Sequence, residues 1–250
     1  MSDRKTVLIT GGSRGIGAAT AQLAAARGYA VCIGYLRNRA AADEVAGAIV
    51  SSGGKALAVQ ADVAVEADVL RLFEAAEDAF GPLGALVNNA GILERQMRVE
   101  DMDAARLARV FAANVIGSFL CAREAVRRMS TRRGGSGGAI VNVSSIAARL
   151  GGPNEYVDYA ASKGAIDTLT VGLAREVADE GIRVNAVRPG LIYTEIHASG
   201  GEPGRVDRLK SAVPMKRGGD ALEVAQAILW LMSDAASYTT GSFIDVSGGR

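Results

Sequence analysis

The chain has 250 residues, of which 28 are Lys or Arg and 27 are Asp or Glu, so its formal net charge is +1. This balance argues against nucleic acid or an anionic membrane surface as the main partner. Glycine contributes 31 residues and aromatic residues only 5%, which suits tight strand-to-helix turns better than an extended stacking surface. We therefore expect one α/β domain over residues 1–250 with a small-molecule ligand.

The first residues lead directly into an apolar segment, without the basic region and cleavage site of a secretory signal. Apolar runs such as residues 7–9 are far shorter than the roughly 20 residues of a membrane-spanning helix. A cytoplasmic protein without a membrane partner is expected. Cys32 and Cys121 lie in apolar stretches without neighbouring ligands. They predict buried thiols in a reducing compartment, and no metal site.

Short β-branched segments alternate along the chain with longer segments of helical periodicity. The predicted strands are Thr6–Thr10, Ala30–Tyr35, Ala56–Gln60, Ala85–Asn88, Gly138–Ser144, Arg183–Arg188 and Ser242–Val246. The predicted helices are Gly15–Arg27, Ala40–Ser51, Glu66–Phe80, Asp103–Met129, Tyr159–Glu180 and Leu222–Met232. Asp220 and Glu223 form a capping-box pattern before the last helix. This alternation predicts a parallel sheet with helices on both faces.

The longest region without a clear pattern is Pro189 to Gly219, which is rich in Gly and Pro. It follows a predicted strand end, where open α/β sheets bind ligands. We interpret it as a mobile substrate lid in preference to a disordered insert. Residues 132–138 are glycine-rich but too short to separate two domains, and they predict a helix-to-strand loop.

A glycine-rich turn follows the first predicted strand and opens the first helix. Residues 10–17, Thr-Gly-Gly-Ser-Arg-Gly-Ile-Gly, have the spacing Gly-x-x-x-Gly-x-Gly rather than the commoner Gly-x-Gly-x-x-Gly. Glycines let the backbone approach a pyrophosphate, and the free amides of the helix N-terminus stabilise its charge. A dinucleotide site is expected in this context. Its expected contacts are Gly11, Ser13, Arg14, Gly15, Ile16 and Gly17.

Two further motifs accompany this turn: Asn-Asn-Ala-Gly over residues 88–91 and Tyr-Ala-Ala-Ser-Lys over residues 159–163. In this order and at this spacing, the three motifs resemble those of the classical short-chain dehydrogenase/reductases over nearly the whole chain. The resemblance implies a doubly wound Rossmann fold with seven parallel strands and a nicotinamide cofactor at their carboxyl ends. It also implies an oxidoreductase that is commonly a homotetramer. Small and apolar residues on the long helices favour such an assembly; they include Ala112, Ala161, Ala165 and Leu169.

Tyr159 and Lys163 stand four residues apart on a predicted helix, so they project from the same face. A nearby ammonium favours the phenolate, which a tyrosine with an ordinary pKa of about 10 needs to act as a base. By resemblance, Ser145 contacts the substrate oxygen, with Ser144 as the alternative. Asn114 interrupts a predicted helix, where asparagine is a poor helix former. The resemblance implies that it holds a water linking the lysine to solvent; a local kink is the alternative.

The same resemblance implies cofactor contacts after other strands, in addition to contacts from Tyr159 and Lys163. Two residues contact the adenine, three lie near its ribose, and four lie beside the nicotinamide. In that order these are Asp62 and Val63; Asn89, Ala90 and Gly91; and Pro189, Gly190, Ile192 and Thr194.

The end of the second predicted strand lacks the acidic residue with which NAD-specific sites hold the ribose hydroxyls. Tyr35 occupies that position, followed by Arg37 and Asn38. Arg37 and Arg14 can converge on a 2′-phosphate through charge-assisted hydrogen bonds. The expected cofactor is therefore NADP rather than NAD, with use of both as the alternative.

These residues predict hydride transfer between a nicotinamide and a carbonyl or alcohol. A 3-oxoacyl-type or other ketone reductase is favoured, with a sugar or polyol dehydrogenase as the alternative. A non-catalytic dinucleotide sensor is the alternative of another class, and the complete set of catalytic positions argues against it. His197 and Glu195 lack the partners of a hydrolytic triad. We expect both to be solvated residues of the lid or the substrate rim.

Overall fold

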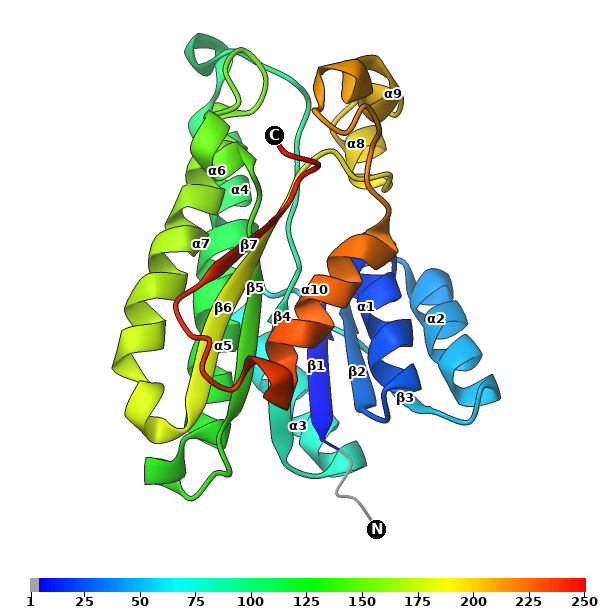
Figure 1. The fold of residues 1–250 in the computed structure, drawn as a ribbon, viewed down its shortest axis with the longest axis vertical. Coiled ribbons are helices and arrows are strands. Elements are labelled where there is room, and N and C mark those ends of the chain that lie inside the picture. The colour runs from blue at the N-terminus through cyan, green and yellow to red at the C-terminus, as the bar shows by residue number, and fades with distance from the viewer. Residues whose placement is uncertain (1–4) are drawn as a thin grey trace.

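The computed structural model describes residues 5–250. Seven strands form one parallel sheet in the order β3-β2-β1-β4-β5-β6-β7 (Figure 1). Their bounds are β1 Thr6–Thr10, β2 Ala30–Tyr35, β3 Lys55–Gln60, β4 Leu83–Asn88, β5 Gly138–Val143, β6 Ile182–Pro189 and β7 Phe243–Val246. The strand order reverses between β1 and β4, which is where doubly wound folds bind ligands. The predicted α/β Rossmann fold with seven parallel strands is confirmed.

Helices cover both faces of the sheet, as predicted. Successive strand residues point to opposite faces, so Ile9 and Ile33 join one core while Leu8 and Cys32 join the other. The first core is covered by α1 Gly15–Ala26, α2 Arg39–Ser51 and α10 Ala221–Met232. The second is covered by α3 Glu66–Phe80, α5 Gly117–Met129 and α7 Val157–Glu176. The capping box of Asp220 and Glu223 is present at the start of α10.

The helix predicted over Asp103–Met129 is interrupted. Its residues form α4 Ala104–Phe111, a π-helical turn over Ala112–Ile116 and α5, with Asp103 capping α4. The other long helix, α7, begins two residues before Tyr159 and ends at Glu176, with a short 3-10 turn after it. The remaining predicted elements agree to within about two residues at each end.

Residues 189–219 are folded, so the alternative of a disordered insert is wrong. The segment contains two short helices, α8 Ile196–Ser199 and α9 Arg205–Leu209. Its two ends pair, because the Tyr193 amide donates to the Gly219 carbonyl at 2.9 Å. Leu191, Val206 and Val213 form a small core of its own. We call this segment the lid; its mobility stays a prediction.

Both cysteines are buried, and burial raises the pKa of each thiol to about 12. Residues 104–129 are the one helical stretch within residues 5–250 that is long and apolar enough to cross a membrane by length and composition. The short apolar runs of the sequence did not predict such a stretch. Here its second half packs on β4 and α3 as a core helix. The expectation about a secretory signal falls mainly on residues 1–4, which lie outside the described residues.

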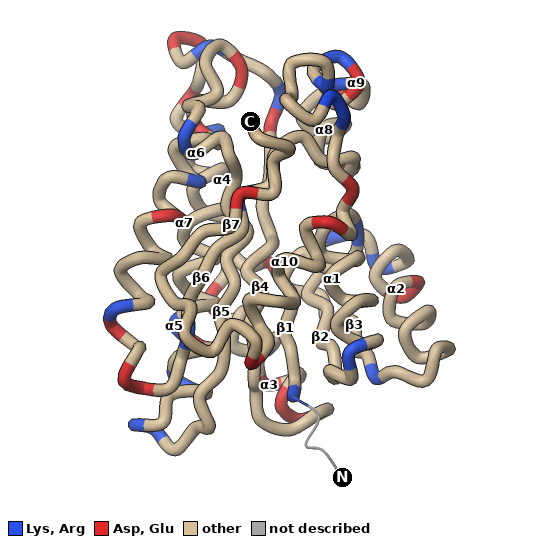
Figure 2. The backbone as a smooth tube through the Cα atoms, in the orientation of Figure 1, with Lys and Arg blue, Asp and Glu red and all other residues tan. Residues whose placement is uncertain are grey.

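Charged residues of both signs are interspersed along the helices and loops in the view of Figure 2, and the lid carries both. Short helices of the lid lie beyond the carboxyl ends of the strands (Figure 1). Any ligand bound at the strand ends is therefore bordered by the lid.

Candidate functional site

The glycine positions of the turn between β1 and α1 leave little room for an added side chain. A Cβ atom added to Gly17 would lie 2.4 Å from the Gly11 carbonyl oxygen and 2.6 Å from Asn89 Nδ2. Gly11 and Gly15 have φ angles of +63° and +53°, which L side chains rarely adopt. Arg14, the N-cap residue of α1, makes no side-chain cap hydrogen bond. The turn therefore fits a pyrophosphate that approaches the backbone and the amides of α1.

The end of β4 is fastened to this turn. Asn89 Nδ2 donates to the carbonyl oxygens of Thr10 and Gly11, each at 2.9 Å. Thr10 Oγ1 accepts hydrogen bonds from the Asn89 and Ala90 amides at 3.1 and 3.0 Å. The Asn89 side chain therefore shapes the turn, and Thr10, which sequence reasoning did not single out, fixes its start.

Three predicted catalytic residues meet at the carboxyl end of β5. Lys163 Nζ donates to the Val143 carbonyl at 2.7 Å and lies 5.6 Å from the centroid of the Tyr159 ring. The Ser145 side chain is close enough to Tyr159 to act on its phenol, whose pKa it lowers against the larger effect of burial. Ser144 is buried, and its hydroxyl donates to Asp167 Oδ1 at 2.6 Å. Of the two serines, Ser145 is thus the one beside the tyrosine.

Burial dominates the ionisation of the tyrosine and the lysine. It raises the pKa of Tyr159 to about 12, against the opposing effect of the Ser145 hydrogen bond. It also lowers the pKa of Lys163 to about 8, while Asp167 acts in the opposite direction. The lysine was expected to favour the phenolate, but burial is stronger here, and Lys163 Nζ donates to a backbone carbonyl instead. At neutral pH the site contains a phenol that can donate a proton.

Asn114 is fully buried in the π-helical turn before α5. Its Oδ1 accepts from the Ile92 amide at 2.7 Å, and its Nδ2 donates to Ser162 Oγ at 3.0 Å. A Cβ atom added to Gly91 would lie 3.3 Å from Asn114 Oδ1 and 3.5 Å from Lys163 Nζ. Asn114 therefore lies both in a helix irregularity and close to Lys163. A role in the local kink and a role in holding a water near the lysine do not exclude each other.

The residues predicted to select the cofactor lie at the end of β2. Tyr35 is buried, whereas Arg37 is exposed and its guanidinium has no carboxylate partner within residues 5–250. Asn38 Oδ1 accepts from the Ala41 amide at 3.0 Å and caps α2. Arg14 Nη2 donates to Ser199 Oγ of the lid at 3.3 Å. Arg37 is thus available to an anion, while Arg14 joins the turn to the lid.

The predicted adenine contacts form a fixed turn after β3. Asp62 Oδ1 accepts from the Ala64 amide at 2.9 Å, and the Asp62 amide donates to Asp68 Oδ2 at 2.9 Å. Val63 packs against the start of α5, where a Cβ atom added to Gly117 would lie 2.7 Å from it. Side chain and backbone are therefore both held in place at this strand end.

The segment predicted to lie beside the nicotinamide runs from β6 into the lid. Pro189 ends β6, and the Gly190 amide donates to the Val246 carbonyl at 2.9 Å. Ile192 pairs with Gly219, and Thr194 Cγ2 lies 3.1 Å from the position of a Cβ on Gly15. The start of the lid therefore borders the glycine-rich turn.

His197 is not a solvated lid residue, so that expectation is wrong. It is 9% exposed, and its Nε2 lies 3.0 Å from the Ile192 carbonyl oxygen. Its Nδ1 has no hydrogen-bond partner among the described residues, and burial lowers the pKa of the imidazole. The cause is the compact folding of the lid. Glu195 is exposed near Gly15, as expected for a rim residue.

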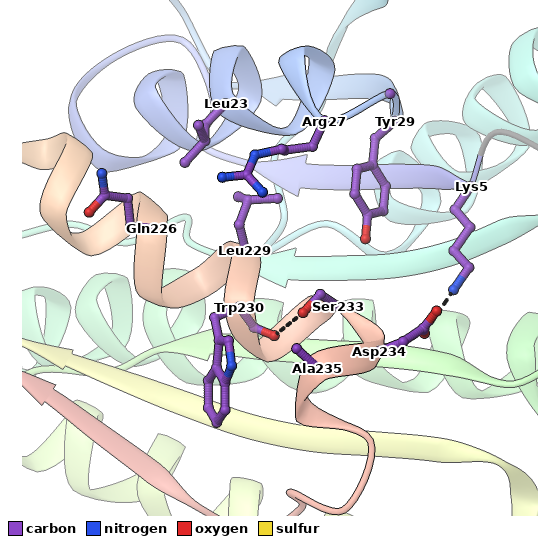
Figure 3. A pocket seen from close by; sticks show the side chains of 11 residues that line it. Lys5, Leu23, Arg27, Tyr29, Gln226, Leu229, Trp230, Ser233, Asp234 and Ala235 are labelled. Carbon is purple, nitrogen blue, oxygen red and sulfur yellow. Dashed lines mark hydrogen bonds and ion pairs between the residues drawn. The ribbon is translucent and has the colours of Figure 1, made fainter.

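The larger of the two main pockets, of about 580 Å³, is not this site. It lies between α1 and α10, with Lys5, Tyr29 and Trp230 in its lining (Figure 3). Lys5 directly precedes β1, so this pocket is at the amino ends of the strands, opposite to Tyr159. Among residues 5–250 no group of three or more His, Cys, Asp or Glu residues is arranged to bind a metal. The candidate site is therefore distinct from this pocket and consists of the tyrosine cluster and the glycine-rich turn.

Comparisons with known proteins agree with this geometry. Residues 11–250 match the family described as enoyl-(acyl carrier protein) reductase. The chain is 65% identical to an oxidoreductase of Escherichia coli, YgfF, over 97% of this chain and 98% of that protein. It is 39% identical to glucose 1-dehydrogenase 2 of Bacillus subtilis over 98% and 94%.

A solved structure of 3-ketoacyl-(acyl-carrier-protein) reductase from Brucella melitensis, complexed with NADH, superimposes with a TM-score of 0.91. It is 35% identical and covers 98% of each chain. Fold, motif positions and relatives lead to the same assignment. The chain belongs to the short-chain dehydrogenase/reductase family of oxidoreductases.

Proposed function

We propose that this chain is an NADPH-dependent reductase of ketones, with 3-oxoacyl compounds favoured as substrates and Tyr159 as the proton donor. The observation that carries the proposal is the cluster at the carboxyl end of β5. There burial raises the pKa of the Tyr159 phenol to about 12, the Ser145 side chain acts to lower it, and Lys163 Nζ lies 5.6 Å from the centroid of the tyrosine ring. A group that keeps its proton at neutral pH suits the reduction of a carbonyl, in which the alkoxide oxygen must be protonated.

The residues divide the work as follows. The Ser145 and Tyr159 hydroxyls donate hydrogen bonds to the carbonyl oxygen and polarise it. Tyr159 then gives its proton to that oxygen, and the Lys163 ammonium, held by the Val143 carbonyl, stabilises the phenolate that remains. Asn114, next to Lys163, is proposed to hold the water through which the proton is replaced. A bound dinucleotide supplies the hydride, and the glycine-rich turn with the amides of α1 would hold its pyrophosphate.

NADP is proposed over NAD because no acidic residue stands at the end of β2, where the exposed Arg37 has no carboxylate partner in the described chain. The remaining predicted contacts, from Asp62 and Val63 to Thr194, are proposed to surround the adenine and the nicotinamide. The Brucella relative was solved with NADH, so use of both cofactors is the alternative to be tested.

Two relatives define the substrate alternatives. The Brucella protein is named as a 3-ketoacyl reductase, and the Bacillus protein as a glucose dehydrogenase. A panel of ethyl acetoacetate, an acetoacetyl thioester, cyclohexanone and glucose separates them. Oxidation of NADPH by the first three supports the proposal, whereas glucose oxidation alone favours the sugar dehydrogenase. Dinucleotide binding with no turnover on a broad panel would favour a sensor.

The same assay tests Tyr159. Tyr159→Phe is expected to lower kcat by at least about 100-fold, the usual contribution of a general acid, and to leave dinucleotide affinity nearly unchanged. Tyr238→Phe is the matched control, because Tyr238 is fully exposed. Equal turnover of the two variants would remove Tyr159 from the mechanism.

A cytoplasmic homotetramer is proposed as the assembled form. Four large apolar side chains are exposed along α4, the π-helical turn and α5 in the single chain; they are Leu107, Phe111, Ile116 and Phe119. Such a face favours packing against a second copy. Leu169, expected on the same surface, is instead buried within the chain. Light scattering at micromolar concentration should give about four times the mass of one chain; the mass of a single chain would contradict this.

A further inference from the structure

A buried ion pair lies directly beside the tyrosine cluster. Arg106 of α4 and Asp158 of α7 face each other with side chains that are only 4% and 1% exposed. Arg106 Nε donates to Asp158 Oδ2 at 2.7 Å, and Nη2 donates to Oδ1 at 3.3 Å. This two-point contact fixes the orientation of both planar groups, which a single hydrogen bond does not.

The pair connects two parts of the site. Asp158 directly precedes Tyr159, and its Oδ1 accepts from the Tyr159 amide at 2.9 Å. Arg106 Nη1 donates to the Arg95 carbonyl at 2.7 Å, in the loop that follows β4. Arg95 also borders the lid, because its Cγ lies 3.4 Å from the position of a Cβ on Gly201. One guanidinium thus joins the first turn of α7 to a loop that borders the lid.

Stability alone is a poor explanation for this arrangement. Removing two charges from water is costly, and apolar residues of similar volume often give a fold of equal or greater stability. A rigid, directional contact has a different effect, because it fixes where the backbone of Tyr159 lies. A displacement of about 1 Å in a reacting group can lower a rate about 100-fold.

We infer that Arg106 and Asp158 are positioning residues, which hold the backbone of Tyr159 and the loop after β4 in the geometry that proton transfer requires. This inference rests on the proposed function of Tyr159. Neither residue touches substrate or cofactor in this assignment. Their effect is on kcat, through the placement of the phenol, and not on dinucleotide affinity.

The test uses Arg106→Lys and Asp158→Asn in the full-length protein. Lysine keeps the charge but cannot make the two-point contact together with the bond to Arg95. Asparagine can still accept the Tyr159 amide but leaves the guanidinium without a carboxylate. We expect kcat on the fastest ketone of the panel to fall roughly 10- to 100-fold in Arg106→Lys, and less in Asp158→Asn. KM and the NADPH dissociation constant should stay within about twofold.

Arg128→Lys is the matched control. Arg128 pairs with Glu124 and Glu77 on α5 and α3, with side chains 16% and 3% exposed in the first pair, at a distance from the tyrosine. It should lose a similar amount of thermal stability and keep wild-type kcat. Hydrogen exchange supplies a readout that needs no activity, because the Tyr159 amide should exchange faster in Arg106→Lys than in Arg128→Lys.

The outcomes separate the two hypotheses. An inactive Tyr159→Phe with fully active Arg106→Lys and Asp158→Asn variants would overturn the positioning role alone. An active Tyr159→Phe would overturn the proposed function. A fall in kcat that Arg128→Lys shares to the same degree would reduce the pair to a structural contact. If Arg106→Lys does not fold, Asp158→Asn and the exchange rate of its Tyr159 amide decide the question.

Discussion

The proposed cofactor side of the site, around the glycine-rich turn, and the proposed substrate side, around Tyr159 and the lid, are held together by different means. On the cofactor side, backbone atoms lie so close that Gly17 leaves no space for a methyl group, and the Asn89 side chain bonds to backbone carbonyls. On the substrate side, charged side chains join segments far apart in the chain. Backbone constraints tolerate almost no substitution, whereas networks of side chains can be retuned one residue at a time.

The lid shows most clearly how charged side chains join segments that are far apart in the chain. Arg205 Nη2 bonds to Glu155 Oε2 at 2.5 Å, and its guanidinium lies 5.0 Å from the centroid of the Tyr156 ring. Arg208 Nη2 bonds to Glu202 Oε2 at 2.8 Å, and the hydrogen bond from Arg208 lowers the pKa of Glu202 to about 2. Arg205 thus joins the lid to the loop that precedes α7, as does Arg208 through a longer contact with Glu155 at 3.5 Å, whereas the pair of Arg208 and Glu202 lies within the lid. We call these four charged residues the lid clasp.

The largest effect on the proposed cofactor site is expected from the substitution Gly17→Ala. The added Cβ would meet a backbone oxygen that cannot move away, so the affinity for both dinucleotides should fall beyond roughly 150-fold, the equivalent of about 3 kcal/mol. Gly47→Ala in α2 is the control, because nothing lies within 4 Å of its added Cβ. Calorimetric titration with NADPH and NADH measures both. Unchanged affinity in Gly17→Ala would show that this turn does not hold the cofactor.

A smaller effect, confined to one dinucleotide, is expected from Arg37→Ala. Loss of a charge-assisted hydrogen bond to a 2′-phosphate should weaken NADP binding by roughly 10- to 150-fold and leave NAD binding almost unchanged. Arg39→Ala, an exposed arginine on the first turn of α2, is the control. Equal losses for the two dinucleotides, or tighter wild-type binding of NAD, would show that the assignment of NADP is wrong.

The pH dependence of the reaction rate tests the ionisation state of Tyr159 in the unmutated protein. Because the pKa of Tyr159 is raised to about 12, oxidation of an alcohol requires loss of a proton that is still bound at neutral pH. Oxidation should therefore accelerate up to about tenfold per pH unit between pH 7 and 8 and become level above pH 8, where Lys163 loses the proton that stabilises the phenolate. Reduction should be level below pH 7.5 and decline above it, as Lys163 loses its proton near its pKa of about 8. Identical profiles in the two directions would contradict these ionisation states.

The smallest effect is expected at the lid clasp. Glu202→Gln removes a partly exposed carboxylate that two arginines share, so KM should rise only a few-fold, with little change in kcat. The wild-type KM should itself rise with ionic strength, because salt screens these pairs. Lys210→Gln, which breaks an exposed pair in the same segment, is the control. A KM that is insensitive to both salt and Glu202→Gln would mean that the clasp does not bear on substrate binding.

The contrast between contacts within a short segment and contacts between distant segments explains which parts of the site could be predicted from the sequence. The glycine turn and the pair of Tyr159 and Lys163 each lie within a short segment, so their spacing is visible in the sequence. Their proposed roles came from the resemblance of the joint motifs to a known family, because neither spacing alone is specific. Arg106 and Asp158 are 52 positions apart, and Arg205 and Glu155 are 50 apart. No local pattern marks such pairs. The burial of His197 escaped prediction for a related reason, because it depends on how the lid folds on itself.

The π-helical turn at Asn114 could be predicted only in part. An asparagine inside a helical pattern indicated an irregularity there, but not its form. That form depends on the bond from the Ile92 amide to Asn114 Oδ1, across 22 positions. The sense of the tyrosine pKa was also missed, because a spacing indicates which groups are neighbours and does not give their distance from water.

The pairing of the two ends of the lid affects how easily the length of the lid can change, in evolution or by design. Because Ile192 pairs with Gly219, the segment leaves the end of β6 and comes back beside its own start just before α10. Changing the length of such an excursion costs little loop-closure entropy, since the ends stay together whatever lies between them. Residues between these two anchors can therefore be lengthened, shortened or transplanted from a relative while the seven strands keep their register. If the lid borders the substrate as proposed, its residues can thus change, and with them the substrate range, while the sheet and the glycine-rich turn stay the same.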